Sequence, residues 1–206
     1  FFQHREACNK YYDALPEVVE KYMGKINEKL GTNYQLFNYY GAPDADRVIV
    51  AMGSICDVAE EVIDYLTAHG EKVGLVKVRL FRPFRADKLV AAIPETAKKI
   101  AVLDRTKEPG AQGEPLFMDV VTAFATSGRQ AKIIGGRYGL SSKDTPPASV
   151  FAVYDELKKD EPKSQFTVGI VDDVTHLSLT EKSREETPNT AAEGTIECKF
   201  WGLGGD

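Results

Sequence analysis

The residues best suited to chemistry follow apolar runs that are typical of buried strands. The first run covers residues 47–52, and Gly53-Ser54 comes directly after it. Glycine lets a ligand approach the backbone and serine can donate a hydrogen bond, so this pair could cradle a phosphate at the start of a helix. The same pattern is typical of a tight strand-to-helix turn with Ser54 near the helix cap, and we favour that interpretation.

A denser group of charges follows the run at residues 100–103. This loop places five charged side chains around two glycines and two prolines: Asp104, Arg105, Lys107, Glu108 and Glu114. The five could form a catalytic acid–base pair or an anion clamp. They could equally form an ion-pair network that docks on a neighbouring domain, because surfaces between domains are commonly polar. We favour docking, with Arg105 and Lys107 as its contacts.

Two further glycine-rich segments follow strand-like runs. Gly136-Arg137-Tyr138-Gly139 comes after residues 132–135, and it offers Arg137 as an anion contact or docking residue and Tyr138 as an interface aromatic. Near the end of the chain, a turn of Gly202, Leu203, Gly204, Gly205 and Asp206 follows residues 195–200. A strand that feeds such a turn commonly opens a helix whose N–H groups hold an anion; a tight turn is the alternative.

The cysteines and histidines do not complete a catalytic set. Cys8, Cys56 and Cys198 are far apart and show no zinc or CxxC spacing. Cys56 lies near a predicted helix start, which would lower its pKa, but buried packing is the favoured role. The three histidines have no triad-like neighbours, and His69 suits a helix C-terminus. Alone, this chain is not expected to be an enzyme, and no residue in it is a predicted metal ligand.

Composition narrows the partners. The chain has 206 residues, a net charge of -5, 43% hydrophobic residues and no long basic run. This argues against nucleic acid or an anionic membrane as the main partner. No apolar run approaches the ~20 residues that span a bilayer.

Alternating strands and helices must position these residues. Apolar runs at 47–52, 73–80, 100–103 and 132–135 predict four strands, and helical stripes near 58–66, 87–93, 116–125 and 147–157 alternate with them. This order predicts a three-layer α/β domain with a mainly parallel sheet covered on both faces.

The flanks follow different patterns. Residues 15–30 predict a helix with Pro16 in its first turn and Gly31 as its stop. Residues 34–40 predict an edge strand or tether, and residues 166–171 one more strand. We therefore expect four parts: a tail and linker at 1–40, the α/β domain at 41–160, a strand and exposed linker at 161–194, and a truncated domain start at 195–206. The break after Asp206 and the missing initial Met predict a piece of a longer polypeptide.

The chain resembles the pyruvate:ferredoxin (or flavodoxin) oxidoreductases over its whole length. The resemblance is carried by residues 39–54, 81–84, 102–116, 135–144 and 197–206. It implies a parent enzyme that decarboxylates pyruvate with thiamine diphosphate and Mg, and passes electrons through [4Fe–4S] clusters to ferredoxin or flavodoxin. The acetyl group goes to coenzyme A. The resemblance also implies a homodimer in the cytoplasm, or in a hydrogenosome if the source is an anaerobic protist.

The same resemblance assigns the parts. Residues 1–40 would be the tail of a thiamine-type domain and residues 41–160 a transketolase C-terminal-like domain. The thiamine and cluster sites would lie outside this chain, and residues 202–206 would form part of the coenzyme A loop. The leading hypothesis is thus a non-catalytic piece that supplies scaffold and an edge of the coenzyme A site. The alternative is a free-standing Rossmann-like module that binds a nucleotide or phosphate with Gly53-Ser54 and residues 104–115.

Overall fold

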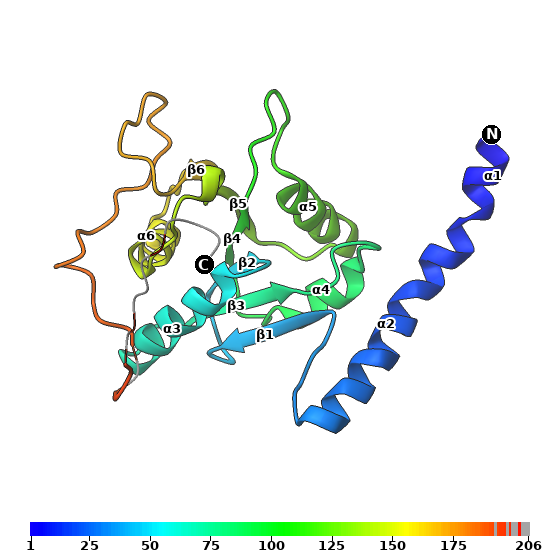
Figure 1. The fold of residues 1–206 in the computed structure, drawn as a ribbon. Helices are drawn as coiled ribbons and strands as arrows, with labels where there is room; N and C mark the ends of the chain where they lie inside the picture. Colours follow the sequence, from blue (N-terminus) through cyan, green and yellow to red (C-terminus); the bar gives the residue numbers. More distant parts are fainter. Residues whose placement is uncertain (192, 197, 199–201, 203–206) are drawn as a thin grey trace.

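One mostly parallel sheet organises the protein. A computed structural model describes residues 1–191, 193–196, 198 and 202 (Figure 1). Within these residues the strand order is β1-β3-β2-β4-β5-β6. Only β1 is antiparallel to its neighbour there. The strands are β1 (Phe37–Gly41), β2 (Arg47–Ala51), β3 (Val73–Val78), β4 (Lys99–Asp104), β5 (Lys132–Arg137) and β6 (Gln165–Thr167).

Helices cover both faces of this sheet. Alternate residues of β2 point to opposite sides: Ile49 packs with α3 (Ile55–Ala68) and α6 (Pro147–Lys158), and Val48 packs with α4 (Ala86–Ala92) and α5 (Pro115–Ser127). Both residues are fully buried. A parallel strand buried on both faces reads as a continuous apolar run, which is why the four central strands were predictable. The predicted α/β architecture is confirmed.

The sheet edges differ from the sequence expectations in detail. β1 is an edge strand, and it pairs antiparallel with β3 from Phe37 opposite Val78 to Gly41 opposite Gly74. β6 covers three residues, so the predicted strand at 166–171 is too long. Beyond β6 the chain loops out and returns, and Ser178 forms one isolated parallel bridge with Thr167. A short 3-10 helix, Leu140–Ser142, precedes α6.

The N-terminal helices form an arm that projects from this body. α1 (Phe2–Ala7) and α2 (Asn9–Leu30) run together along one side of the molecule (Figure 1). Gly31, at φ 66°, ends α2 as predicted, and its N–H donates to the Asn27 carbonyl at 2.8 Å. The predicted position of Pro16 is wrong, because α2 begins seven residues earlier, at Asn9. Pro16 therefore lies inside the helix, where it cannot donate to the carbonyl four residues back.

None of the helices in the described residues combines the length and apolar character that a membrane crossing requires.

Candidate functional site

A cleft of about 290 Å³ opens at the carboxyl ends of the central strands. β2 has β3 on one side and β4 on the other, so the connections diverge here, as at the ligand sites of open α/β sheets. Loops after β2, β3, β4 and β5 line it with Met52, Gly53, Ser54, Phe81, Asp104, Arg105, Thr106, Pro115 and Tyr138. The structure thus brings together two of the three segments that the sequence singled out, with Tyr138 from the third.

The β2 end of this cleft is a tight turn. Gly53 adopts φ 84°, a left-handed conformation that favours glycine, and Ser54 is the N-cap residue of α3. The Ser54 side chain is exposed and makes no capping hydrogen bond. The structural interpretation of Gly53-Ser54 is therefore confirmed in position. Cys56, in the first turn of α3, is only 4% exposed, and burial raises the pKa of its thiol to about 11.

The acidic residue at the β4 end serves the fold. Asp104 is 3% exposed, and its carboxylate accepts hydrogen bonds from the N–H groups of Leu116 and Phe117 at 2.9 and 3.1 Å. These belong to the first turn of α5, whose N–H groups have no partner inside the helix. Burial raises the pKa of the Asp104 carboxyl, although the two hydrogen bonds act in the opposite direction. Asp104 is thus a helix cap reached from a strand twelve residues away.

A buried ion pair closes the loop between β4 and α5. Arg137 Nε lies 2.7 Å from Glu114 Oε1, with 7% and 2% of the two side chains exposed. Arg137 also donates to the Gln165 side chain, and Gln165 Nε2 donates to the Gln112 carbonyl at 2.6 Å. The loop is therefore tied to β5 and β6 through its own charges. The guanidinium of Arg137, predicted as an anion or docking contact, is committed inside the domain.

The other two predicted docking residues remain exposed. Arg105 is held by one bond from Nε to the Gly139 carbonyl at 2.9 Å, and Lys107 Nζ donates to the Glu108 carbonyl at 3.3 Å. Gly139 has φ 66°, and a Cβ on it would lie 3.0 Å from Arg105 Nε. Arg105 therefore lies flat on Gly139, and its two Nη groups have no hydrogen-bond partner among the described residues. A docking role for Arg105 and Lys107 stays a prediction.

Of two ring side chains that the sequence singled out, Tyr138 departs from its prediction and His69 agrees with it. Tyr138, predicted as an interface aromatic, is wrong in that role: it is 6% exposed, and its hydroxyl donates to the Met52 carbonyl at 3.3 Å. Burial raises its pKa to about 12. His69 caps the end of α3 as expected, with Nδ1 2.6 Å from the Tyr65 carbonyl.

The described residues contain little of the cofactor sites that the resemblance implies. Of the predicted coenzyme A loop only Gly202 is described; Leu203, Gly204, Gly205 and Asp206 lie outside the described residues. Among the described residues, no three His, Cys, Asp or Glu side chains converge as metal ligands would. Three cysteines in the whole chain also cannot supply the four thiolates of a [4Fe–4S] cluster. The residues of this chain do not fit such a cluster.

The arrangement suits positioning better than catalysis. Asp104, Glu114 and Arg137, the buried charged groups at this edge, are all used in capping and ion pairing within the fold. What is left for a partner is Arg105 and Ser54, which line the cleft, and the exposed Lys107, which does not. Sequence reasoning missed Gln165, which anchors the loop. One signal for the Arg137–Glu114 pair was available in the sequence: Arg137 is a charged residue directly after a run that predicts a buried strand, where a charge needs a partner.

Comparisons with known proteins point to one family. Residues 45–147 match the family model described as pyruvate:ferredoxin oxidoreductase core domain II. Over its whole length the chain is 54% identical to the pyruvate:ferredoxin oxidoreductase of Moorella thermoacetica, and the match covers 17% of that protein. It is 52% identical to 17% of the pyruvate-flavodoxin oxidoreductase of Enterobacter agglomerans. The chain therefore spans about one sixth of the length of these curated relatives.

Among solved structures, a 2-oxoglutarate:ferredoxin oxidoreductase from Magnetococcus marinus shows a weaker likeness. It matches with a TM-score of 0.41 and 21% identity over 61% of this chain and 20% of that one. A likeness of this size carries no argument.

Proposed function

The chain belongs to the pyruvate:ferredoxin oxidoreductase family, and from this premise we propose that it supplies one α/β unit of a larger enzyme that oxidises pyruvate. The unit would act as a scaffold and not as a catalyst by itself. The observation that carries the proposal is the identity of 52–54% along all 206 residues to enzymes named for pyruvate and for ferredoxin or flavodoxin. The acceptor, ferredoxin or flavodoxin, is left open by these names.

The site geometry supports the scaffold role. The buried charges at the carboxyl edge stabilise the loop between β4 and α5, which presents Arg105 and Lys107 to the outside. Carboxylates or backbone carbonyls of a neighbouring domain would complete their hydrogen bonding. In this proposal Arg137 contributes indirectly, by holding the loop that carries the two docking residues. The unit would correspond to a transketolase C-terminal-like domain.

The remaining parts of the proposal come from the resemblance. Thiamine diphosphate with Mg and the [4Fe–4S] clusters would be bound by the rest of the enzyme, which would decarboxylate pyruvate and form acetyl-CoA. A homodimer and a cytoplasmic location belong to the same proposal.

A chimera tests this function. In the Moorella thermoacetica enzyme, this chain would replace the 206 matching residues. We expect pyruvate- and coenzyme A-dependent reduction of ferredoxin by the chimera and none by the 206-residue chain alone. A chimera that folds and retains its cofactors but does not oxidise pyruvate would contradict the proposal. Tight binding of a nucleotide by the chain alone, lost on Ser54→Ala, would instead favour the Rossmann-like module.

The coenzyme A loop has its own test. Glycine permits the close backbone approach that a phosphate needs, so Gly204→Val in the chimera should raise the Michaelis constant for coenzyme A. Pyruvate decarboxylation to the enzyme-bound intermediate should persist, because that step needs no coenzyme A. Loss of the intermediate with unchanged coenzyme A affinity would assign residues 202–206 to the thiamine site or to folding.

A further inference from the structure

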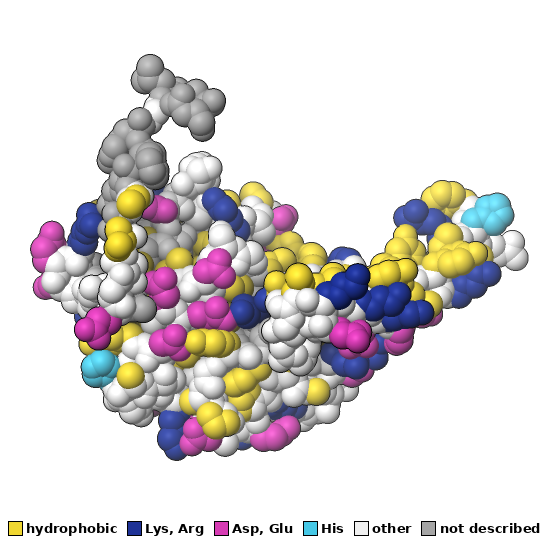
Figure 2. All heavy atoms as spheres, turned by 60° about the horizontal axis from the view of Figure 1, so that its bottom comes forward, with side chains coloured by type: hydrophobic (Ala, Val, Ile, Leu, Met, Phe, Trp, Pro, Cys, Tyr) yellow, Lys and Arg dark blue, Asp and Glu magenta, His cyan; other side chains and the backbone are white. Residues whose placement is uncertain are grey.

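An apolar stripe runs along the exposed side of α2. Its members recur at helical spacing on one face and are 39–67% exposed: Tyr11, Leu15, Val18, Tyr22 and Ile26. Figure 2 shows hydrophobic side chains together with Lys and Arg along the projecting arm. Single exposed apolar residues are ordinary on a protein surface, but a continuous row of large ones marks an interaction site.

The adjacent face of α2 already has a partner. Pro16 is buried, and Val19 and Met23 pack partly against the core layer that contains α4 and α5. Glu20 forms an ion pair with Lys88 of α4 at 3.1 Å, and Glu17 one with Arg85 at 2.9 Å. The helix is therefore fixed in orientation, and the stripe is turned away from the body.

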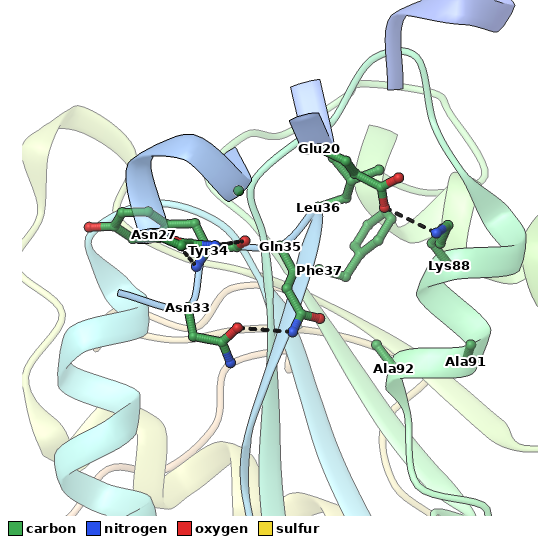
Figure 3. A pocket seen from close by; sticks show the side chains of 11 residues that line it. Glu20, Asn27, Asn33, Tyr34, Gln35, Leu36, Phe37, Lys88, Ala91 and Ala92 are labelled. Atoms are coloured by element: carbon green, nitrogen blue, oxygen red, sulfur yellow. Dashed lines mark hydrogen bonds and ion pairs between the residues drawn. The ribbon is translucent and has the colours of Figure 1, made fainter. Parts of the chain in front are cut away.

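The base of α2 shows how this orientation is held. A hollow of about 400 Å³ separates the helix from α4 and residues 33–37 (Figure 3). Across it, the Asn27 side chain donates to the Tyr34 carbonyl at 2.9 Å and accepts from the Tyr34 N–H at 2.7 Å. The Glu20–Lys88 pair lies at the opposite side of the hollow (Figure 3). The paired polar side chains around the hollow hold α2 against the body, and none of the stripe residues takes part in these contacts.

The charges beside the C-terminal half of the stripe are mainly positive. Residues 21–30 contain Lys21, Lys25 and Lys29 against one carboxylate, Glu28. Among the described residues, none of these three lysines forms an ion pair. Lys25 lies over the Tyr22 ring at 4.8 Å, so charge and apolar surface are adjacent. The acidic residues Glu17 and Glu20 are already paired with the body. A surface complementary to the stripe would be apolar with an acidic rim.

We propose that this stripe docks an apolar, acid-rimmed surface carried by another part of the same long polypeptide. The inference rests on the proposed function, in which the chain is one sixth of a larger enzyme. That length supplies abundant surface on one chain, at an effective concentration that a separate partner would rarely reach. A second copy of this chain fits less well, because it would bring lysines against lysines.

Cysteine labelling tests the docking. Cys8 and Cys198 are exposed and would be replaced by Ser; Val18→Cys would then report on the stripe and Asp13→Cys, also exposed but off the stripe, would serve as control. In the 206-residue chain both should react rapidly with a maleimide. In the chimera, Val18→Cys should react at least about tenfold more slowly, since modification requires local exposure, and Asp13→Cys should not change. Lys25→Glu should restore much of the Val18→Cys reactivity.

The outcomes separate this inference from the proposed function. Full reactivity of Val18→Cys in a chimera that still oxidises pyruvate would overturn the docking and leave the function intact. Equal protection of both cysteines would overturn the choice of face. Protection that grows with concentration in the 206-residue chain would identify a second copy as the occupant. Restoration of reactivity by Lys25→Glu, with unchanged cofactor content, would support the acidic rim.

Discussion

The loop after β4 and the helix α2 differ in how far their most conspicuous side chains are buried. The loop brings five charges to the carboxyl edge of the sheet. Three side chains at this edge are buried: Asp104 caps α5, and Glu114 forms an ion pair with Arg137. α2 has an equally conspicuous pattern, an apolar stripe, yet Tyr11 and Tyr22 remain 67% and 58% exposed. One region closes on itself and the other does not.

This difference shows that the density of a motif does not tell whether it faces inward or outward. Buried charges must be paired because removing them from water is costly, so a charged loop can be purely structural. An amphipathic helix gains most of its stability from the surface it covers. Within the described residues, only part of the apolar surface of α2 is covered. The uncovered part of α2 is therefore a stronger sign of a binding partner than the charges of the loop, which are largely paired within the fold.

The largest expected effect comes from opening the loop's ion pair. Glu114→Ala would leave Arg137 buried and unpaired, and removing one member of such a pair typically costs about 3–5 kcal/mol. We expect a loss of this size in the free energy of unfolding of the 206-residue chain, measured with urea. The matched control is Glu161→Ala, which breaks the pair with Lys132 at a residue 92% exposed and should cost at most about 1 kcal/mol.

The double variant sharpens this result. Glu114→Ala combined with Arg137→Met removes both charges and should recover part of the loss, because apolar replacement of a whole buried pair is often tolerated. A single variant as stable as the unchanged chain would show that the loop is not held by this pair, and the contrast with α2 would fail.

A smaller effect should depend on pH. Burial raises the pKa of Asp104 in the folded chain above its ordinary value of 3.8. Stability contributed by the protonated group is fully present below the unfolded pKa and is lost as the pH rises through the folded pKa. Asn does not titrate, so the free energy of unfolding of Asp104→Asn should gain on that of the unchanged chain as the pH rises above the ordinary pKa of the carboxyl. A constant or shrinking difference would mean that the two N–H bonds outweigh burial.

The sheet was the most predictable part. Val48, Ile49 and Val50 form a continuous apolar run because helices cover both faces of β2, and that pattern is visible without a structure. The antiparallel direction of β1 was not, since Phe37 opposite Val78 joins residues 41 apart in the chain. The interior position of Pro16 was also missed, because proline is typical of the first turn of a helix and not of its interior.

The site was less predictable than the fold. Exposed and buried arginines look alike in a sequence, and only tertiary pairing tells Arg137 from Arg105. Tyr138 follows the same logic: its burial depends on its place in the core beside α3, and its own segment gives no sign of it. Residues whose role depends on the local backbone conformation, such as Gly31 and Gly53 with their positive φ, were identified correctly.

Exposed docking residues should have little effect in the chain alone. Arg105 is exposed, and its Nε donates one hydrogen bond, at 2.9 Å to the Gly139 carbonyl, so Arg105→Ala should cost at most about 1 kcal/mol in the 206-residue chain. In the chimera it should lower the melting temperature or cofactor retention, because a partner group would lose its contact. A large drop in turnover with unchanged melting and unchanged thiamine content would instead place Arg105 at the active site.

The smallest expected effect distinguishes the two regions most directly. Val18→Ala, in the stripe, should change the free energy of unfolding of the 206-residue chain by no more than about 0.5 kcal/mol, since Val18 is 46% exposed and alanine is the better helix former. The matched variant Val76→Ala removes the same atoms from a fully buried strand position and should cost about 2–4 kcal/mol, from the lost transfer energy and the cavity. In the chimera the cost of Val18→Ala should rise toward that of Val76→Ala if the stripe is covered there. Equal, negligible costs of Val18→Ala in the 206-residue chain and in the chimera would mean that the stripe of α2 stays uncovered in the chimera. The contrast between the two regions would then persist in the longer enzyme.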